Sequence, residues 1–141
     1  MPSGSEQGTV LLLGARSDIG GEIAARVCQG REVVLAARGS GGLADVEKRL
    51  LAAGATAVRT LDFDATDLES HRRIVREAGE VTTAIVAFGI LGDQELAERD
   101  EHEAARIATV DYLAKVSMLR VLADEMTSGE IFAFSSIAGR R

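Results

Sequence analysis

The chain alternates short runs of β-branched and aliphatic residues with longer amphipathic segments. Runs that are apolar at nearly every position are typical of strands buried on both faces of a parallel sheet. The pattern predicts five strands, at residues 9–13, 32–37, 57–63, 82–88 and 131–134.

The segments between these strands have the periodicity of helices. Each carries an apolar face, formed in turn by Ile19, Ile23 and Val27, by Val46, Leu50 and Leu51, and by Leu68, His71, Ile74 and Val75. The longest helical stretch runs from about residue 95 to residue 126, and acidic residues at 95–103 would form its first turns. Its apolar stripe, suited to burial against a sheet or a partner helix, is Ile107, Val110, Ala114, Ser117 and Val121.

Strands that alternate with helices predict an α/β fold with a Rossmann-type, doubly wound parallel sheet. Residues 1–8 are expected to form a flexible arm and residues 9–141 a nucleotide-binding domain. In such a sheet a ligand binds beyond the carboxyl ends of the strands, at the switch point between the first and fourth strands. The residues that follow each strand are therefore the candidates for function.

Composition narrows the classes of protein that fit this pattern. With 141 residues, 46% of them hydrophobic and 27% charged, the chain has the size and balance of one globular domain. Its net charge of −6, without a long basic cluster, disfavours a nucleic-acid partner. Cys28 is the only cysteine, which favours a reducing, cytoplasmic setting. The first residues lack the features of a signal peptide, and no apolar run is long enough to span a bilayer, so any membrane contact would be peripheral. A small molecule is therefore the expected partner.

A glycine-bearing turn, residues 14–21, follows the first strand and leads into the first helix. In a phosphate-binding turn Gly14 would make the tight bend, Gly20 would let helix and strand pack closely, and N–H groups at the helix start would meet a pyrophosphate. The alternative is a plain connector between strand and helix. The candidate cofactor contacts of this turn are Gly14, Arg16, Ser17, Asp18, Ile19 and Gly20.

The second strand leads into Arg38, at a position where an acidic residue would be expected to bind the 2′-hydroxyl of NAD. Arg38 suits the 2′-phosphate of NADP, and Arg16 could form the other side of a clamp, since a guanidinium binds a phosphate through two hydrogen bonds. The alternative is two solvated surface arginines. We therefore predict NADP as the cofactor, with NAD as the alternative.

The third and fourth strands end in further candidates. Asp64 and Ala65 follow the third strand, where they would contact an adenine, whereas Asp67 is explained as an N-cap of the next helix. The candidates after the fourth strand are Ala87, Phe88 and Gly89. A glycine there lets the backbone pass close to a ligand, and Phe88 is alternatively a core residue.

The fifth strand leads into Ser135 and Ser136. Their hydroxyls could orient a carbonyl by hydrogen bonding, or they could simply form a turn. No Gly-x-Ser-x-Gly motif surrounds them, which argues against an acyl-enzyme hydrolase.

Four other residues with reactive side chains receive structural interpretations. His71 and His102 lack the spacing of metal ligands and are expected at the surface or in a groove, so no metal site is predicted. Tyr112 and Lys115 lie three residues apart in the long helix. They are interpreted as a core-edge aromatic and a solvated amine.

The order and spacing of these motifs resemble the amino-terminal half of short-chain dehydrogenases/reductases, the matching stretches being residues 14–20, 35–38, 64–67, 87–89 and 134–139. Three shorter stretches resemble the decaprenylphosphoryl-2-keto-pentose reductase subgroup, namely residues 10–20, 62–71 and 84–93. The superfamily resemblance extends over nearly the whole chain, and the subgroup resemblance over these three stretches only.

The resemblance implies a Rossmann fold, a nicotinamide cofactor and a carbonyl reduced with the help of Ser, Tyr and Lys side chains and an Asn on the long helix. By position Ser136 is the serine, and Asp111 replaces the asparagine; an ionised Asp111 accepts hydrogen bonds and cannot donate them. Asp18 replaces the middle glycine of the cofactor turn, and Val86-Ala87 replaces two asparagines. The sequence reaches Arg141 before any Tyr-x-x-x-Lys, so we expect a reductase domain truncated after its fifth strand.

These observations leave two main hypotheses for function. One is an NADP-dependent oxidoreductase that reduces a ketone, which the subgroup resemblance would make a keto-sugar, lipid-linked and met at a membrane surface. The other is a nucleotide-binding or regulatory module without catalysis, because Asp111 replaces the asparagine and the Tyr and Lys are missing. A nucleotide-free interaction domain is a third. The resemblance also implies pairing of chains through the long helix, so a homo-oligomer is expected.

Overall fold

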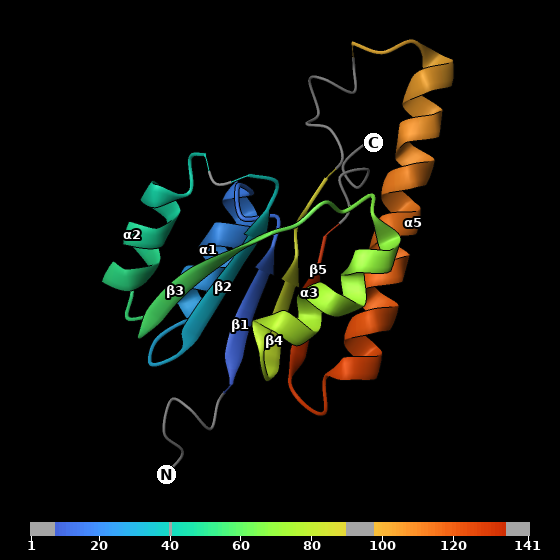
Figure 1. Ribbon diagram of the computed structural model, residues 1–141. Helices are drawn as coiled ribbons and strands as arrows, with labels where there is room; N and C mark the ends of the chain where they lie inside the picture. The colour runs from blue at the N-terminus through green and yellow to red at the C-terminus, as the bar shows by residue number, and fades with distance from the viewer. Residues whose placement is uncertain (1–7, 40, 90–97, 135–141) are drawn as a thin grey trace.

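The computed structural model, which describes residues 8–39, 41–89 and 98–134, contains a five-stranded parallel sheet (Figure 1). The strands are β1 (Thr9–Leu13), β2 (Glu32–Ala37), β3 (Ala57–Asp62), β4 (Val81–Val86) and β5 (Glu130–Ala133). Their spatial order is β3-β2-β1-β4-β5, and every neighbouring pair is parallel. All five predicted strands are confirmed, but the expected burial is wrong for β3 and β5, whose residues are mostly exposed because these strands form the two edges of the sheet. The fourth ends earlier than predicted, at Val86, which leaves Phe88 beyond the strand.

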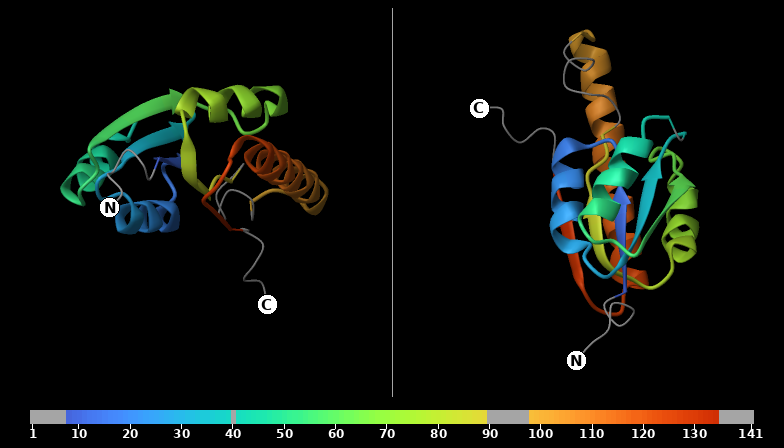
Figure 2. Two further views of the ribbon diagram at one scale, coloured as in Figure 1. Left: turned by 90° about the horizontal axis from the view of Figure 1, so that it is seen from below. Right: turned by 90° about the vertical axis from the view of Figure 1, so that its left-hand side faces the viewer.

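Helices cover both faces of the sheet (Figure 2), as predicted for a doubly wound fold. They are α1 (Asp18–Val27), α2 (Ala44–Ala52), the short 3-10 helix η2 (Leu68–Ser70), α3 (His71–Ala78) and α5 (Glu101–Glu125). One hydrophobic core lies between the sheet and α1 with α2, and the other between the sheet and α3 with α5.

The central strand β1 is covered by helices on both faces of the sheet, which accounts for its apolar sequence. All five of its residues are buried. Leu11 and Leu13 belong to the core under α3 and α5, whereas Val10 and Leu12 belong to the core under α1 and α2. Because successive side chains point to opposite faces, a strand covered on both sides is apolar at nearly every position, as β1 is after Thr9.

The long helix α5 begins later than predicted. Asp100 is its N-cap, and its carboxylate accepts a hydrogen bond from the backbone N–H of Glu103 at 2.8 Å. Residues 98–100 therefore precede the helix, and the predicted helical residue Glu95 lies outside the described residues. Asp100 satisfies a helix-start donor, which is why the helix begins directly after it.

The buried face of α5 is concentrated in its second half, at Ala114, Met118, Val121 and Leu122. Met118 and Leu122 were not part of the predicted stripe, and Ile107 and Val110 are only partly buried. The first half of α5 extends past the ends of the strands (Figure 1), so fewer elements cover it. Among the described residues, no helix combines the length and the apolar character needed to cross a membrane.

Candidate functional site

The carboxyl ends of β1, β2, β3 and β4 lie at one edge of the sheet because these strands are parallel. β1 lies between β2 and β4, so the chain turns to opposite sides on leaving β1 and on leaving β3. The predicted switch point between the first and fourth strands is therefore present. The two ends are joined directly, since the N–H of Ala87 donates to the carbonyl of Leu13 at 2.8 Å.

The turn between β1 and α1 is pressed against the end of β4. Gly14 has φ +101°, and a Cβ added there would lie 2.6 Å from the backbone N of Phe88 and 2.8 Å from the backbone C of Ala87. A Cβ added at Gly20 would lie 2.8 Å from the Cβ of Ala87 and 2.9 Å from Cδ1 of Leu12. At Gly14 the contacts are with the backbone of β4's end, so no side chain fits there, whereas at Gly20 a side chain would displace those of Ala87 and Leu12.

The start of α1 lies at this same edge. Ser17 is the N-cap, and its Oγ accepts a hydrogen bond from the N–H of Gly20 at 3.0 Å. Asp18, the first residue of the helix, is exposed, and Ile19 keeps 53% of its surface exposed. The positive end of a helix dipole suits a phosphate, and an exposed isoleucine offers an apolar surface to a ring. The Asp18 carboxylate adds negative charge at the place where a phosphate would bind.

Arg16 binds the loop after β2 rather than standing free in solvent. Its Nη1 donates to the carbonyl of Arg38 at 3.0 Å, and its Nε donates to the carbonyl of Gly41 at 3.0 Å. The same loop is held by Asp62 at the end of β3, whose Oδ1 accepts from the N–H of Gly39 at 2.9 Å. Arg16 is exposed, as the alternative interpretation of a surface arginine expects, and its guanidinium N–H groups donate to carbonyls of the loop.

Asp64 organises the turn after β3. Its Oδ1 accepts hydrogen bonds from the hydroxyl of Thr66 at 2.7 Å and from the N–H of Thr66 at 3.0 Å. These two hydrogen bonds, the hydroxyl's first, hold the pKa of Asp64 below its ordinary value. Asp67, predicted as an N-cap, is the N-cap residue of the short helix η2 that precedes α3, but its side chain makes no cap hydrogen bond. The carbonyl of Asp67 instead accepts from the hydroxyl of Ser70 at 2.7 Å.

His71 is completely buried, which contradicts its predicted place at the surface or in a groove. It is the first residue of α3, and both ring nitrogens have hydrogen-bond partners. Its ring lies 5.7 Å from that of Phe63, which in turn lies 5.5 Å from Phe88 in an edge-to-face arrangement. Phe88 is 7% exposed and thus belongs to the core, as the alternative interpretation proposed.

Asp111 and Lys115 form an ion pair on the inner side of α5. Lys115 Nζ lies 2.7 Å from Asp111 Oδ2, and each side chain is 13% exposed. The ammonium group also lies 5.6 Å from the centre of the Phe88 ring. The interpretation of Lys115 as a solvated amine is therefore wrong, and so is that of Tyr112 as a core-edge aromatic, because Tyr112 is 64% exposed.

Sequence reasoning missed this pair, although its spacing carried a signal. An Asp and a Lys four residues apart on a helix lie on the same face and can pair. The spacing predicts the pair, but it cannot predict that this face of α5 points toward the end of β4.

The structure thus gathers most of the predicted site at one edge of the sheet. Ala87 is partly buried and Gly89 is exposed beyond the end of β4. Ser136 lies outside the described residues. Among the residues that the structure describes, no group of three His, Cys, Asp or Glu side chains is placed to hold a metal ion.

Comparison with known proteins gives a consistent result. A family model described as short chain dehydrogenase matches residues 8–141. An uncharacterized oxidoreductase of Mycobacterium tuberculosis is 48% identical over 139 residues, a match that covers 94% of this chain and 56% of the relative. An uncharacterized oxidoreductase of Streptomyces coelicolor is 38% identical over 141 residues, with the same two coverages. The chain therefore spans about half the length of the curated relatives it matches.

Solved structures match the fold. A short-chain type dehydrogenase/reductase from Mycobacterium ulcerans superposes with a TM-score of 0.73 at 26% identity, over 93% of this chain and 52% of that one. A 3-oxoacyl (acyl-carrier-protein) reductase from Agrobacterium tumefaciens, solved with NADP bound, gives a TM-score of 0.72 at 23% identity, over 97% of this chain and 57% of that one.

Proposed function

Because the chain belongs to the short-chain dehydrogenase family, we propose that it forms the cofactor-binding part of an NADP-dependent oxidoreductase that reduces a ketone. One observation carries the proposal. The turn from Gly14 to Gly20 leads into a helix start at the switch point of the sheet, and its two glycines leave no room for a Cβ. A tight turn that leads into a helix start at the switch point is the arrangement that suits a dinucleotide pyrophosphate.

The residues at this edge fit such a cofactor. The turn and the start of α1 would hold the pyrophosphate, and the exposed Ile19 would pack against the nicotinamide end. Asp64 and Ala65 would receive the adenine, and Gly89 would let the end of β4 pass beneath the cofactor. When bound, the nicotinamide supplies a hydride to a carbonyl carbon.

The preference for NADP rests on Arg38. It is exposed directly after β2, where its guanidinium would bind the 2′-phosphate. Arg16 supports Arg38 indirectly, because its hydrogen bonds to the carbonyls of Arg38 and Gly41 hold the loop on which Arg38 lies. NAD is the alternative cofactor. It has no 2′-phosphate, so Arg38 would contribute little to its binding.

The ketone would be oriented by Ser136 and by the helix that carries Asp111. Lys115 supplies donors that an ionised Asp111 lacks, so the pair together presents both donors and acceptors, as an asparagine would. The subgroup resemblance favours a keto-sugar as substrate, lipid-linked and met by a cytoplasmic enzyme in peripheral contact with a membrane. The exposed Tyr112, Leu113 and Val116 on α5 favour a homo-oligomer through that helix.

A nucleotide-binding module without catalysis is the second candidate. It is favoured by the ion pair itself, because the Asp111 carboxylate is already bound by Lys115 and so is less available to a substrate. The two candidates share the cofactor site and differ in turnover. Oxidation of NADPH by the full-length protein in the presence of keto-sugars distinguishes them.

Titration of the full-length protein with NADPH and NADH, followed by nicotinamide fluorescence, tests the cofactor assignment. Arg38→Asp should weaken NADPH binding by about tenfold or more, because it replaces a phosphate-binding cation with an anion. NADH binding should be retained or strengthened. Arg26→Asp makes the same change in charge in the last turn of α1, away from the edge, and should leave both affinities unchanged. If Arg38→Asp binds both cofactors as the unaltered protein does, Arg38 does not bind the 2′-phosphate.

A further inference from the structure

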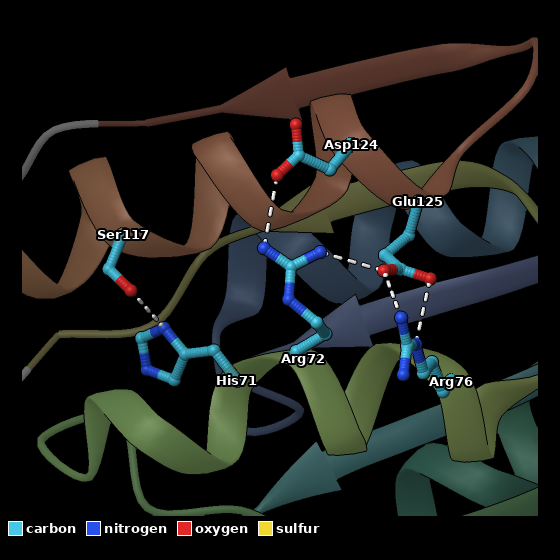
Figure 3. Close-up of polar contacts among 6 residues, drawn as sticks. All are labelled: His71, Arg72, Arg76, Ser117, Asp124 and Glu125. Carbon is cyan, nitrogen blue, oxygen red and sulfur yellow. Dashed lines mark hydrogen bonds and ion pairs between the residues drawn. The ribbon is translucent and has the colours of Figure 1, made fainter.

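His71 lies where the turn after β3 meets α5 (Figure 3). Its Nε2 lies 2.8 Å from the carbonyl oxygen of Ala65, and its Nδ1 lies 2.9 Å from Oγ of Ser117 on α5. The ring is fully buried and packs against Phe63. One side chain therefore joins the turn that contains Ala65 to a helix 46 residues further along the chain.

The chemistry of these partners fixes the ring. A backbone carbonyl can only accept, so Nε2 carries the hydrogen and donates it to Ala65. In the neutral ring Nδ1 then accepts from the hydroxyl of Ser117. Rotating the ring by half a turn would break both hydrogen bonds, so the position of the Ala65 carbonyl is set from α5.

The helix at the other end of this link is itself held firmly. Arg72 pairs with Asp124 at 3.0 Å and with Glu125 at 2.7 Å, and Arg76 pairs with Glu125 at 3.1 Å (Figure 3). These pairs join α3 to the C-terminal end of α5, while the His71–Ser117 bond joins the two helices nearer the site. Ser117 is thus a fixed point against which the turn is positioned.

Stability alone does not explain a histidine here. The ring is fully buried beside Phe63, and burying its two polar nitrogens costs free energy that a valine or leucine would not incur. The hydrogen bonds compensate for this cost only if the turn and α5 hold one arrangement. A buried polar group of this kind therefore favours precise placement of the backbone over maximal stability.

The other turns of the proposed cofactor site are held in a comparable way. The guanidinium of Arg16 holds the loop after β2, and the hydroxyl of Ser17 holds the first turn of α1. Each turn is thus held by at least one side chain that hydrogen-bonds to backbone atoms.

We propose that His71 is a positioning residue for adenine binding: it fixes the backbone of Ala65 against α5 so that the turn after β3 accepts the adenine of the cofactor. This inference rests on the proposed function, since it requires a dinucleotide at this edge. His71 acts through Ala65 and does not itself touch the cofactor.

Fragments of the cofactor test the proposal on the full-length protein. Adenosine 2′,5′-bisphosphate carries the adenine and the 2′-phosphate, and reduced nicotinamide mononucleotide carries neither. His71→Val should weaken binding of the adenosine fragment by about tenfold and leave binding of the nicotinamide fragment unchanged, because the hydrogen bonds to Ala65 and Ser117 that position the turn are both lost. His71→Gln keeps an N–H donor and should restore part of the loss. His102→Gln, at an exposed histidine of α5, is the matched control and should bind both fragments normally.

A second, milder variant tests the proposal in the event that His71→Val does not fold. Ser117→Ala removes only a hydroxyl and should weaken binding of the adenosine fragment by about threefold, with the nicotinamide fragment again unaffected. Nitrogen NMR of the unaltered protein should show the His71 ring protonated at Nε2.

The outcomes separate the inference from the proposed function. If the unaltered protein binds NADPH but His71→Val or Ser117→Ala binds both fragments normally, His71 has no role in adenine binding and the inference is wrong. Equal weakening of both fragments would indicate a purely structural role and would also overturn it. If the unaltered protein binds no nucleotide, the proposed function fails and the inference fails with it.

Discussion

At the scale of single residues, the backbone conformation of a glycine and the space around it have separable effects on stability. Gly14 and Gly39 both have positive φ, +101° and +70°. A Cβ at Gly14 would collide with the backbone of Phe88, whereas a Cβ at Gly39 would meet nothing within 4 Å. The two positions therefore differ in packing more than in backbone preference.

Alanine substitutions measure this difference. Gly14→Ala should lower the free energy of unfolding by about 3 kcal/mol, since it combines a strained φ with overpacking against a rigid backbone. Gly39→Ala should cost about 1 kcal/mol, the cost of the left-handed conformation alone. Urea unfolding of the two variants provides the comparison. Equal losses would mean that the turn after β1 can move away from β4.

At the scale of elements, α3 and α5 are joined by charge as well as by apolar packing. Glu125 accepts hydrogen bonds from Arg76 and Arg72, and these bonds, those of Arg76 first, lower the pKa of the Glu125 carboxyl. A carboxyl whose pKa is lower in the folded state stabilises the fold above its unfolded pKa. That contribution is lost as the pH falls through the folded-state value.

Glu125→Gln should therefore reduce stability at neutral pH and leave stability less sensitive to acid. The difference in unfolding free energy between this variant and the unaltered protein should shrink as the pH falls below about 4, where glutamates in unfolded chains become protonated. Denaturant unfolding at a series of pH values measures it. Glu69→Gln makes the same substitution at a residue of η2 that has no ion pair to any described residue, and it serves as the control. A difference that is constant with pH would contradict the assignment.

At the scale of the whole molecule, α5 leaves apolar surface uncovered. Tyr112, Leu113 and Val116 are 64%, 50% and 43% exposed and share the face opposite the buried Ala114 and Met118. Large apolar residues clustered on an exposed face favour association with another protein surface. We expect this face to lie in the interface of a homo-oligomer.

Leu113→Glu should shift the full-length protein toward the monomer in sedimentation velocity, because it places a charge in the proposed interface. Leu51→Glu on α2 makes the same substitution at a leucine that is 45% exposed and should leave the oligomeric state unchanged. An unaltered sedimentation profile for Leu113→Glu would exclude this face from the interface.

The sequence by itself determined the strands, the order of the helices between them and the glycine turn. Strands covered on both faces are apolar at most positions, and the sharp turn at Gly14 requires a residue without a Cβ, so each leaves a local signal. The start of α5 and the cap at Asp67 were predicted less well, because several nearby acidic residues are equally suited to a helix start.

Only the tertiary structure decided what the polar side chains bind. Arg16 donates to the carbonyl of Arg38, 22 residues away, and His71 pairs with Ser117, 46 residues away. Lys115 lies over Phe88 only because α5 packs beside the end of β4. Periodicity records which face of one element is buried, whereas the partner of a buried polar group comes from another element, and that pairing exists only once the sheet and its helices have assembled.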